Sequence, residues 1–329
     1  MYTVARLRGM ENRFLEPSFF LRLLDSVTTE DALRTLGETP YSQWFSGGNE
    51  VNFDRIIDEE LWHLFDELRQ FVPDRELLDL YRMPYDFNNV KVILKSLFLA
   101  RESGERRYDL LSHLGSMDTE KMVLAIEGEE YGLLPWGLND VVPRCWTLWD
   151  QTKSTRQVEL LLDEHLFASM RKLAEKLKMP AVVRWVRHKT DAENLKNAVR
   201  LQRLGFDAAA ALPFFHRGGT LRPDEVAKLL GEPLESWGKS ISHAGISATL
   251  DTLQDHSDVQ VSLSEFTKAL DNYLIRVLEK AKYISDAPEN VLLYLLQKDM
   301  EVRNLRTVLV CVANGLNREF ARRLLGHGR

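Results

Sequence analysis

Cysteine, glycine and proline are scarce in this chain. Its 329 residues include 2 cysteines, 18 glycines and 11 prolines. Cys145 and Cys311 are too few for a disulfide framework, and neither has the neighbours of a redox or metal-binding motif. Scarce glycine and proline, together with abundant Leu, Glu, Arg, Lys and Ala, favour helix over sheet.

The sequence also lacks long hydrophobic runs. The longest, from Ala208 to Phe215, spans eight residues, whereas a membrane-crossing helix needs about 20. The N-terminal stretch MYTVARLRGMENRFLE carries charges throughout, unlike the apolar core of a signal peptide. We therefore expect a cytoplasmic protein that neither spans a membrane nor is secreted.

Motifs that carry chemistry are missing as well. The eight histidines are scattered without metal-ligand spacing, and there is no GxSxG or Cys–His motif. Gly238-Lys239-Ser240 matches the tail of a phosphate-binding loop, but Pro233 stands where that loop needs its first glycine. The sequence thus predicts no catalytic residue, no cofactor site, no metal site and no nucleotide site.

A net charge of −6 argues against a general nucleic-acid binder, although the charge is unevenly spread. Residues 50–80 carry ten acidic and three basic side chains, and residues 171–203 carry ten basic and three acidic ones. These segments are either solvated helix faces or surfaces for oppositely charged partners. The second interpretation gives six candidate partner contacts: Arg184, Arg187, Lys189, Lys196, Arg200 and Arg203.

One pattern occurs three times: an acid, two residues, asparagine, an apolar residue and a base. The copies are Asp86–Lys91, Asp191–Lys196 and Glu301–Arg306, with their asparagines at Asn89, Asn194 and Asn304, 105 and 110 residues apart. After the first and last asparagine, apolar residues recur at the i, i+3, i+4, i+7 spacing of an amphipathic helix. Gly205 and Gly315 each lie eleven residues after their asparagine, where a helix end is expected.

A second pattern, apolar-Asp-x-x-Leu-bulky, precedes each asparagine. Its aspartates are Asp58, Asp163 and Asp271, and they lie 31, 31 and 33 residues before the asparagines. Strand signals are nearly absent. The sequence therefore predicts an all-α protein of three tandem, similar helical domains, at residues 1–105, 106–212 and 213–329.

Two interpretations of the repeated asparagines are open. They could form a threefold polar site that binds one ligand, or each could be a buried amide that bonds backbone at the same joint in its domain. The residues flanking the asparagines differ widely between copies, which favours the structural interpretation.

Four segments resemble the C subunit of archaeal and bacterial V-type (A-type) ATPases, the counterpart of the d subunit of the eukaryotic vacuolar ATPase. They are YTVARLRGMENRFL, YDFNNVKVILKSLF, VRHKTDAENLKNAVRLQRLGFD and EVRNLRTVLVCVANGLNREFARRLL. The resemblance extends over essentially the whole chain.

This resemblance implies three helical domains in a pseudo-threefold funnel. It implies a non-catalytic rotor subunit of the central stalk, a socket between the D–F shaft and the membrane proteolipid ring. Such a subunit links ATP hydrolysis or synthesis to H⁺ or Na⁺ transport, holds no cofactor, and is peripheral to the membrane through the ring. The alternatives are a helical scaffold of another complex, or an all-α enzyme whose site uses scattered carboxylates and histidines.

Overall fold

The computed structural model describes residues 2–45, 52–103, 106–253, 259–284 and 287–326. Within these ranges the chain forms fifteen α-helices and several short 3₁₀ turns, and no β-strand. The prediction of an all-helical protein is confirmed.

The chain divides into two compact units. We call residues 76–231 the central unit; the terminal unit combines residues 1–75 with residues 232–329. In the terminal unit, the two ends of the sequence thus share one hydrophobic core. The three tandem ranges expected from the sequence remain a prediction, which this division does not test.

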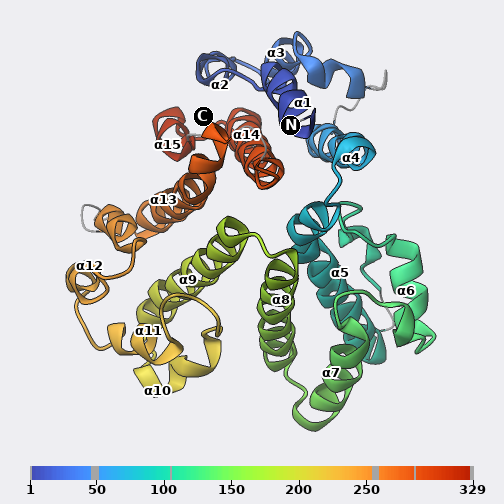
Figure 1. Cartoon of the computed structure of the whole chain (residues 1–329), viewed down its shortest axis with the longest axis vertical. Coiled ribbons are helices and arrows are strands. Elements are labelled where there is room, and N and C mark those ends of the chain that lie inside the picture. Colours follow the sequence, from blue (N-terminus) through green and yellow to red (C-terminus); the bar gives the residue numbers. More distant parts are fainter. Residues whose placement is uncertain (1, 46–51, 104–105, 254–258, 285–286, 327–329) are drawn as a thin grey trace. The chain divides into compact units, whose positions relative to one another are not determined.

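The central unit contains seven helices, coloured from teal to yellow in Figure 1. They are α5 (Glu76–Ser103), α6 (Thr119–Glu127), α7 (Leu138–Thr152), α8 (Thr155–Leu177), α9 (Pro180–Arg203), α10 (Ala208–Ala211) and α11 (Pro223–Leu229). Helix α8 packs against α5, α7 and α9. Its buried residues Leu162, Leu166, Phe167 and Met170 recur at helical spacing, so one stripe of α8 faces this core.

The start and end of α9 follow from its sequence. Pro180 occupies the first turn, where its missing N–H costs no helical hydrogen bond. Gly205 follows the last turn with φ of +76°, a backbone conformation that glycine adopts without strain. Asn194 therefore lies well inside a regular helix.

The terminal unit contains the other eight helices. They are α1 (Tyr2–Met10), α2 (Pro17–Leu24), α3 (Thr29–Leu36), α4 (Phe53–Phe71), α12 (Trp237–Ser240), α13 (Val259–Glu279), α14 (Asn290–Ala313) and α15 (Arg318–Leu324). Helix α14 contacts α1, α2, α3, α4, α13 and α15, which makes it the centre of the unit (Figure 1). Because neighbours surround it, consecutive residues from Val291 to Leu295 are all buried.

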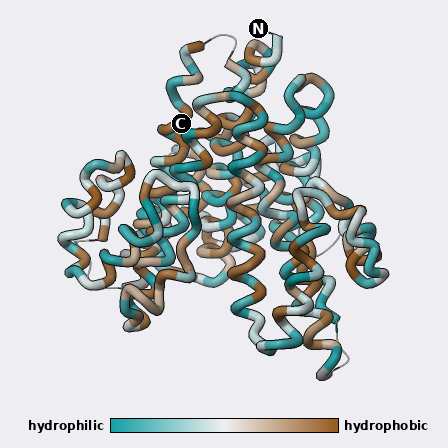
Figure 2. Tube along the Cα trace, turned by 60° about the horizontal axis from the view of Figure 1, so that its bottom comes forward, coloured by the Kyte–Doolittle hydropathy of each residue, from teal (hydrophilic) through white to brown (hydrophobic). Residues whose placement is uncertain are grey.

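In the described part of the chain, no helix combines the length and hydropathy needed to cross a lipid bilayer. Figure 2 shows the reason: polar and apolar residues alternate along the individual helices, as in helices that pack on one side.

Candidate functional site

The three repeated asparagines make the same pair of hydrogen bonds. Asn194 donates from Nδ2 to the carbonyl of His216 (2.8 Å) and accepts from the N–H of the same residue (2.7 Å). Asn89 pairs in this way with Ser112 (2.7 and 2.8 Å). Asn304 pairs with Gly326 (3.1 and 2.8 Å). We call this two-bond pairing the asparagine clasp.

Each clasp joins a buried helix face to one residue of a loop. The three asparagines are at most 6% exposed, and their partners lie 22 or 23 residues later in the chain. A loop residue has no helical partner for its N–H and C=O, and leaving them unpaired in the interior is costly. The asparagine amide supplies both an acceptor and a donor, so one side chain satisfies both backbone groups.

The acid one turn before each asparagine holds the next part of the same loop. In the central unit, Asp191 accepts from the N–H groups of Thr220 and Leu221 (both 3.0 Å). Asp86 accepts from the Met117 N–H (3.2 Å) and from the Trp136 indole (2.9 Å). Burial raises the pKa of both carboxyl groups, and the donated hydrogen bonds oppose that rise.

In the third copy, the donors come from the other end of the chain. Glu301 accepts from the N–H of Leu15 (2.6 Å) and from the hydroxyl of Tyr41 (2.8 Å). Leu15 stands two residues before Pro17 at the start of α2, as Leu221 stands two residues before Pro223 at the start of α11. The N-terminal segment thus takes the place that a following loop takes in the other copies.

Each of the three repeated aspartates pairs with a base on an asparagine-bearing helix: Asp163 with Lys91, Asp58 with Arg306, and Asp271 with Arg303. The first two bases both lie two residues after their asparagine. Asp163 follows Lys91 in the sequence, whereas Asp58 precedes Arg306 by 248 residues. This second contact again brings the N-terminal part of the chain to the third copy.

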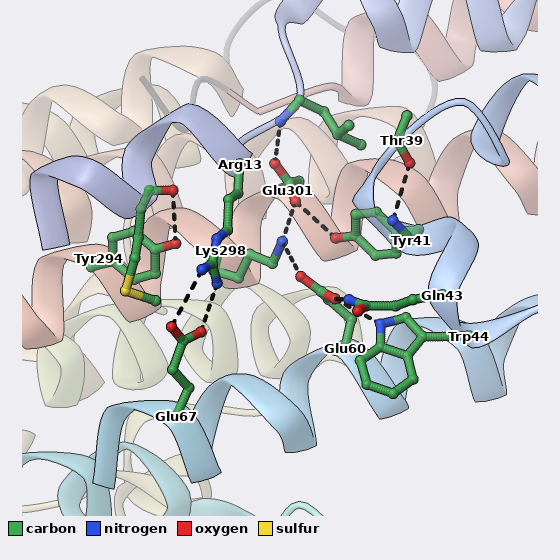
Figure 3. A network of polar contacts seen from close by, with 12 residues as sticks. Arg13, Thr39, Tyr41, Gln43, Trp44, Glu60, Glu67, Tyr294, Lys298 and Glu301 are labelled. Carbon is green, nitrogen blue, oxygen red and sulfur yellow. Dashed lines mark hydrogen bonds and ion pairs between the residues drawn. The ribbon is translucent and has the colours of Figure 1, made fainter. Parts of the chain in front are cut away.

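An ion cluster lies beside the third clasp (Figure 3). The ammonium of Lys298 is 2.7 Å from Glu301 Oε1 and 3.0 Å from Glu60 Oε1, and its side chain is 3% exposed. The Trp44 indole donates to the other oxygen of Glu60 (2.7 Å). This Lys298 cluster joins α14, α4 and the segment 39–44 through charges that are almost fully buried.

The pKa directions of Lys298 and Glu60 favour the charged form of both groups. Burial disfavours the charge on Lys298, but the attraction of Glu301 and Glu60 outweighs it and raises the Lys298 pKa. Burial likewise opposes ionisation of Glu60, yet Lys298 and the Trp44 hydrogen bond lower its pKa. The phenol of Tyr41 stays a donor because burial, followed by the charge of Glu301, raises its pKa well above the usual range.

Sequence reasoning missed the Lys298 cluster. The residues that align with Lys298 in the other copies are Met83 and His188, so no repeat marks this position. The available signal was a lysine two residues after the apolar run 291–296, on a helix too hydrophobic to present that side to water.

The six basic candidates for partner contacts all lie on α9. Arg184, Arg187, Arg200 and Arg203 are exposed, while Lys189 and Lys196 are partly buried. The ammonium of Lys196 is 4.0 Å from Glu193, and that of Lys189 lies 5.7 Å from the centre of the Trp185 ring. Their role toward a partner stays a prediction.

Comparison with known proteins gives consistent matches over nearly the whole chain. The model of a family described as "ATP synthase (C/AC39) subunit" matches residues 3–324. The C subunit of the A-type ATP synthase of Methanocaldococcus jannaschii is 26% identical over 359 residues, covering 98% of this chain and 85% of that protein. The C subunit of the V-type sodium ATPase of Enterococcus hirae is 21% identical, covering 95% and 94%. The C subunit of the V-type ATP synthase of Thermus thermophilus is 29% identical over 228 residues, covering 66% and 67%.

Replacing a clasp asparagine should destabilise the fold. In Asn194→Ala, the N–H and C=O of His216 lose their partner in a buried site, which should lower the free energy of unfolding by about 1–3 kcal/mol. Urea denaturation followed by circular dichroism measures this change. Asn139→Ala, at an exposed asparagine, is the matched control and should change stability by less than about 0.5 kcal/mol. Equal effects of the two substitutions would contradict a structural role of the clasp.

Removing the ammonium of the Lys298 cluster should lower the free energy of unfolding by more than the loss of a clasp asparagine does. Lys298→Met leaves two buried carboxylates without their cation, so we expect a loss of about 3–5 kcal/mol at pH 7. Lys239→Met, at an exposed lysine, is the control and should be nearly neutral.

The pH dependence of this variant provides a sharper test. In the wild type, the lowered Glu60 pKa contributes stability that is lost as pH falls below about 4.5, and the raised Lys298 pKa contributes stability that is lost only above about 10.5. Without Lys298, burial should raise the pKa of Glu60, so acidification should stabilise the variant relative to the wild type. Urea titrations at pH 8 and pH 5 should show the stability gap narrowing, and a gap that widens toward pH 5 would refute the ionised cluster.

Proposed function

Because this chain belongs to the family of ATP synthase C/AC39 subunits, we propose that it is the central-stalk subunit that joins the rotating shaft of a V/A-type ATPase to its membrane ring. The observation that carries this proposal is the family match over residues 3–324, together with relatives named as C subunits along nearly the full length. Subunits of this family are non-catalytic, and the chain offers no motif for chemistry.

The finer features of this role belong to the same proposal. The subunit is a socket for the D–F shaft on one side and rests on the proteolipid ring on the other, in the cytoplasm and peripheral to the membrane. Its three tandem helical domains form a pseudo-threefold funnel. Rotation of this subunit links ATP hydrolysis or synthesis to the transport of H⁺ or Na⁺.

The asparagine clasps and the Lys298 cluster support a role in transmitting torque. A coupling subunit must resist deformation, and closely packed helices do so because their interiors are barely compressible. Loops are usually the weakest parts of a helical protein. Here the clasps at Asn89, Asn194 and Asn304 fasten one loop residue to a long helix in each copy. The repeated asparagines thus serve stiffness rather than ligand binding.

Reconstitution from purified parts tests the proposed function. The full chain, mixed with the D–F shaft of the same ATPase, should elute with it as one complex in gel filtration, and should also bind detergent-solubilised proteolipid ring. The chain alone should hydrolyse no ATP. A chain that binds neither shaft nor ring would refute the proposed function and favour a scaffold role in another complex.

The basic stretch of α9, from Arg184 to Arg203, is our proposed contact with acidic surfaces of the shaft or of the ring loops. Arg184, Arg187 and Arg200 are exposed in this stretch, in a protein whose net charge is −6. Charges at the rim of an interface chiefly set the association rate and its dependence on salt. The basic stretch should therefore speed assembly more than it stabilises the finished complex.

Charge reversal tests the basic stretch. The triple variant Arg184→Glu, Arg187→Glu and Lys196→Glu should associate with the shaft or the ring about tenfold more slowly at low salt, and the difference should shrink at high salt. The control reverses three lysines outside residues 171–203, Lys121, Lys239 and Lys280, which are all exposed. Stopped-flow or biosensor kinetics provide the rates, and unchanged association with both partners at low salt would exclude this stretch as a contact.

A further inference from the structure

A cavity of about 240 Å³ lies in the terminal unit, next to the third asparagine clasp. Its walls come from the segment 14–21, α13, α14 and the end of α15. The apolar part of the lining consists of Phe14, Leu15, Pro17, Phe20, Leu21 and Leu325. The cavity is therefore a mostly hydrophobic space bounded by parts of the chain that are far apart in sequence.

One polar side chain in this lining has no hydrogen-bond partner among the described residues. Gln297 lies on α14, one turn before Glu301, and is only 7% exposed. Its amide makes no hydrogen bond to any described residue, and its nitrogen and oxygen keep some access to solvent. Glu301, by contrast, already accepts from Leu15, Tyr41 and Lys298. The amide of Gln297 is therefore the group left to recognise a guest.

The lining also holds a cation without a counter-ion in direct contact. Lys268 on α13 donates to the carbonyl of Arg323 (2.7 Å), and no carboxylate of the described residues lies within ion-pair distance of its ammonium. Arg322, the other cation in the lining, is already paired with Asp25. Partial burial lowers the pKa of Lys268, and the more distant charge of Glu265 opposes this shift only in part.

We propose that this cavity is a binding site for a small carboxylic acid with an apolar body. The apolar body lies against Phe14, Phe20 and Leu325, and the carboxylate accepts from the Lys268 ammonium and the Gln297 amide. The combination of hydrophobic walls with few convergent polar groups is typical of small-molecule sites. The inference does not depend on the proposed function.

The size of the cavity fits this class of ligand. An apolar protein cavity of about 150 Å³ is large enough to bind benzene. At about 240 Å³, this one has room for an aromatic ring or a short aliphatic chain plus a carboxylate.

Binding of benzoate to the full chain tests the proposal, with benzyl alcohol as the neutral probe of similar size. Saturation-transfer NMR and calorimetry should show saturable binding of benzoate, at least five times tighter than that of benzyl alcohol. Lys268→Met should remove this preference for the acid while leaving benzyl alcohol binding unchanged. Lys239→Met is the matched control, and circular dichroism verifies that each variant is folded.

The Gln297 amide is tested separately, and three results would overturn the site. Gln297→Leu should weaken benzoate binding at least threefold, because the amide no longer donates to the carboxylate. Absence of saturable benzoate binding would overturn the site, and so would equal affinity of the wild type and Lys268→Met for benzoate. Tight binding of benzyl alcohol with no preference for benzoate would also overturn it, since the cavity would then select for shape alone.

Discussion

The pairing of a buried side-chain amide with the backbone N–H and C=O of one loop residue is the constraint on which the rest of this structure depends. A long helix can bury an entire face only if the loop that covers it brings no unpaired backbone group into the interior. Asparagine meets this requirement in the fewest atoms, because its amide matches both polar groups of a single residue. That explains why a residue with poor helix propensity occupies the interior of α5, α9 and α14, the long helices around which the chain packs.

The helices and the repeat could be predicted from the sequence because both follow a regular spacing. Apolar spacing predicts helices wherever one face is buried, and the matched positions of Asn89, Asn194 and Asn304 mark the copies. The partners of the asparagines could not be read in the same way. Ser112, His216 and Gly326 contribute only backbone, so their side chains share nothing that a pattern could detect.

The ion cluster and the contact between Leu15 and Glu301 could not be predicted from the sequence, for a different reason. Neither Lys298 nor Glu60 is repeated in the other copies, so a search for repeats has nothing to compare. Leu15 contacts Glu301 because the N-terminal segment packs against α14, which lies near the other end of the sequence. A prediction made from sequence order instead expects each segment to pack against its neighbours in the chain. Breaking a buried ion group is costly, whereas forming one gives little net stability. The cluster is therefore better suited to fix where the N-terminal segment docks than to strengthen the core.

The contact between Leu15 and Glu301 also has a consequence for the time course of synthesis. The two residues are separated by 286 positions, so a ribosome adding about 5–20 residues per second makes Glu301 roughly 15–60 s after Leu15. During that interval the apolar side chains of Phe14 and Phe20 have no α14 to pack against. Phe14 and Phe20 can therefore reach their final packing only after α14 has been synthesised.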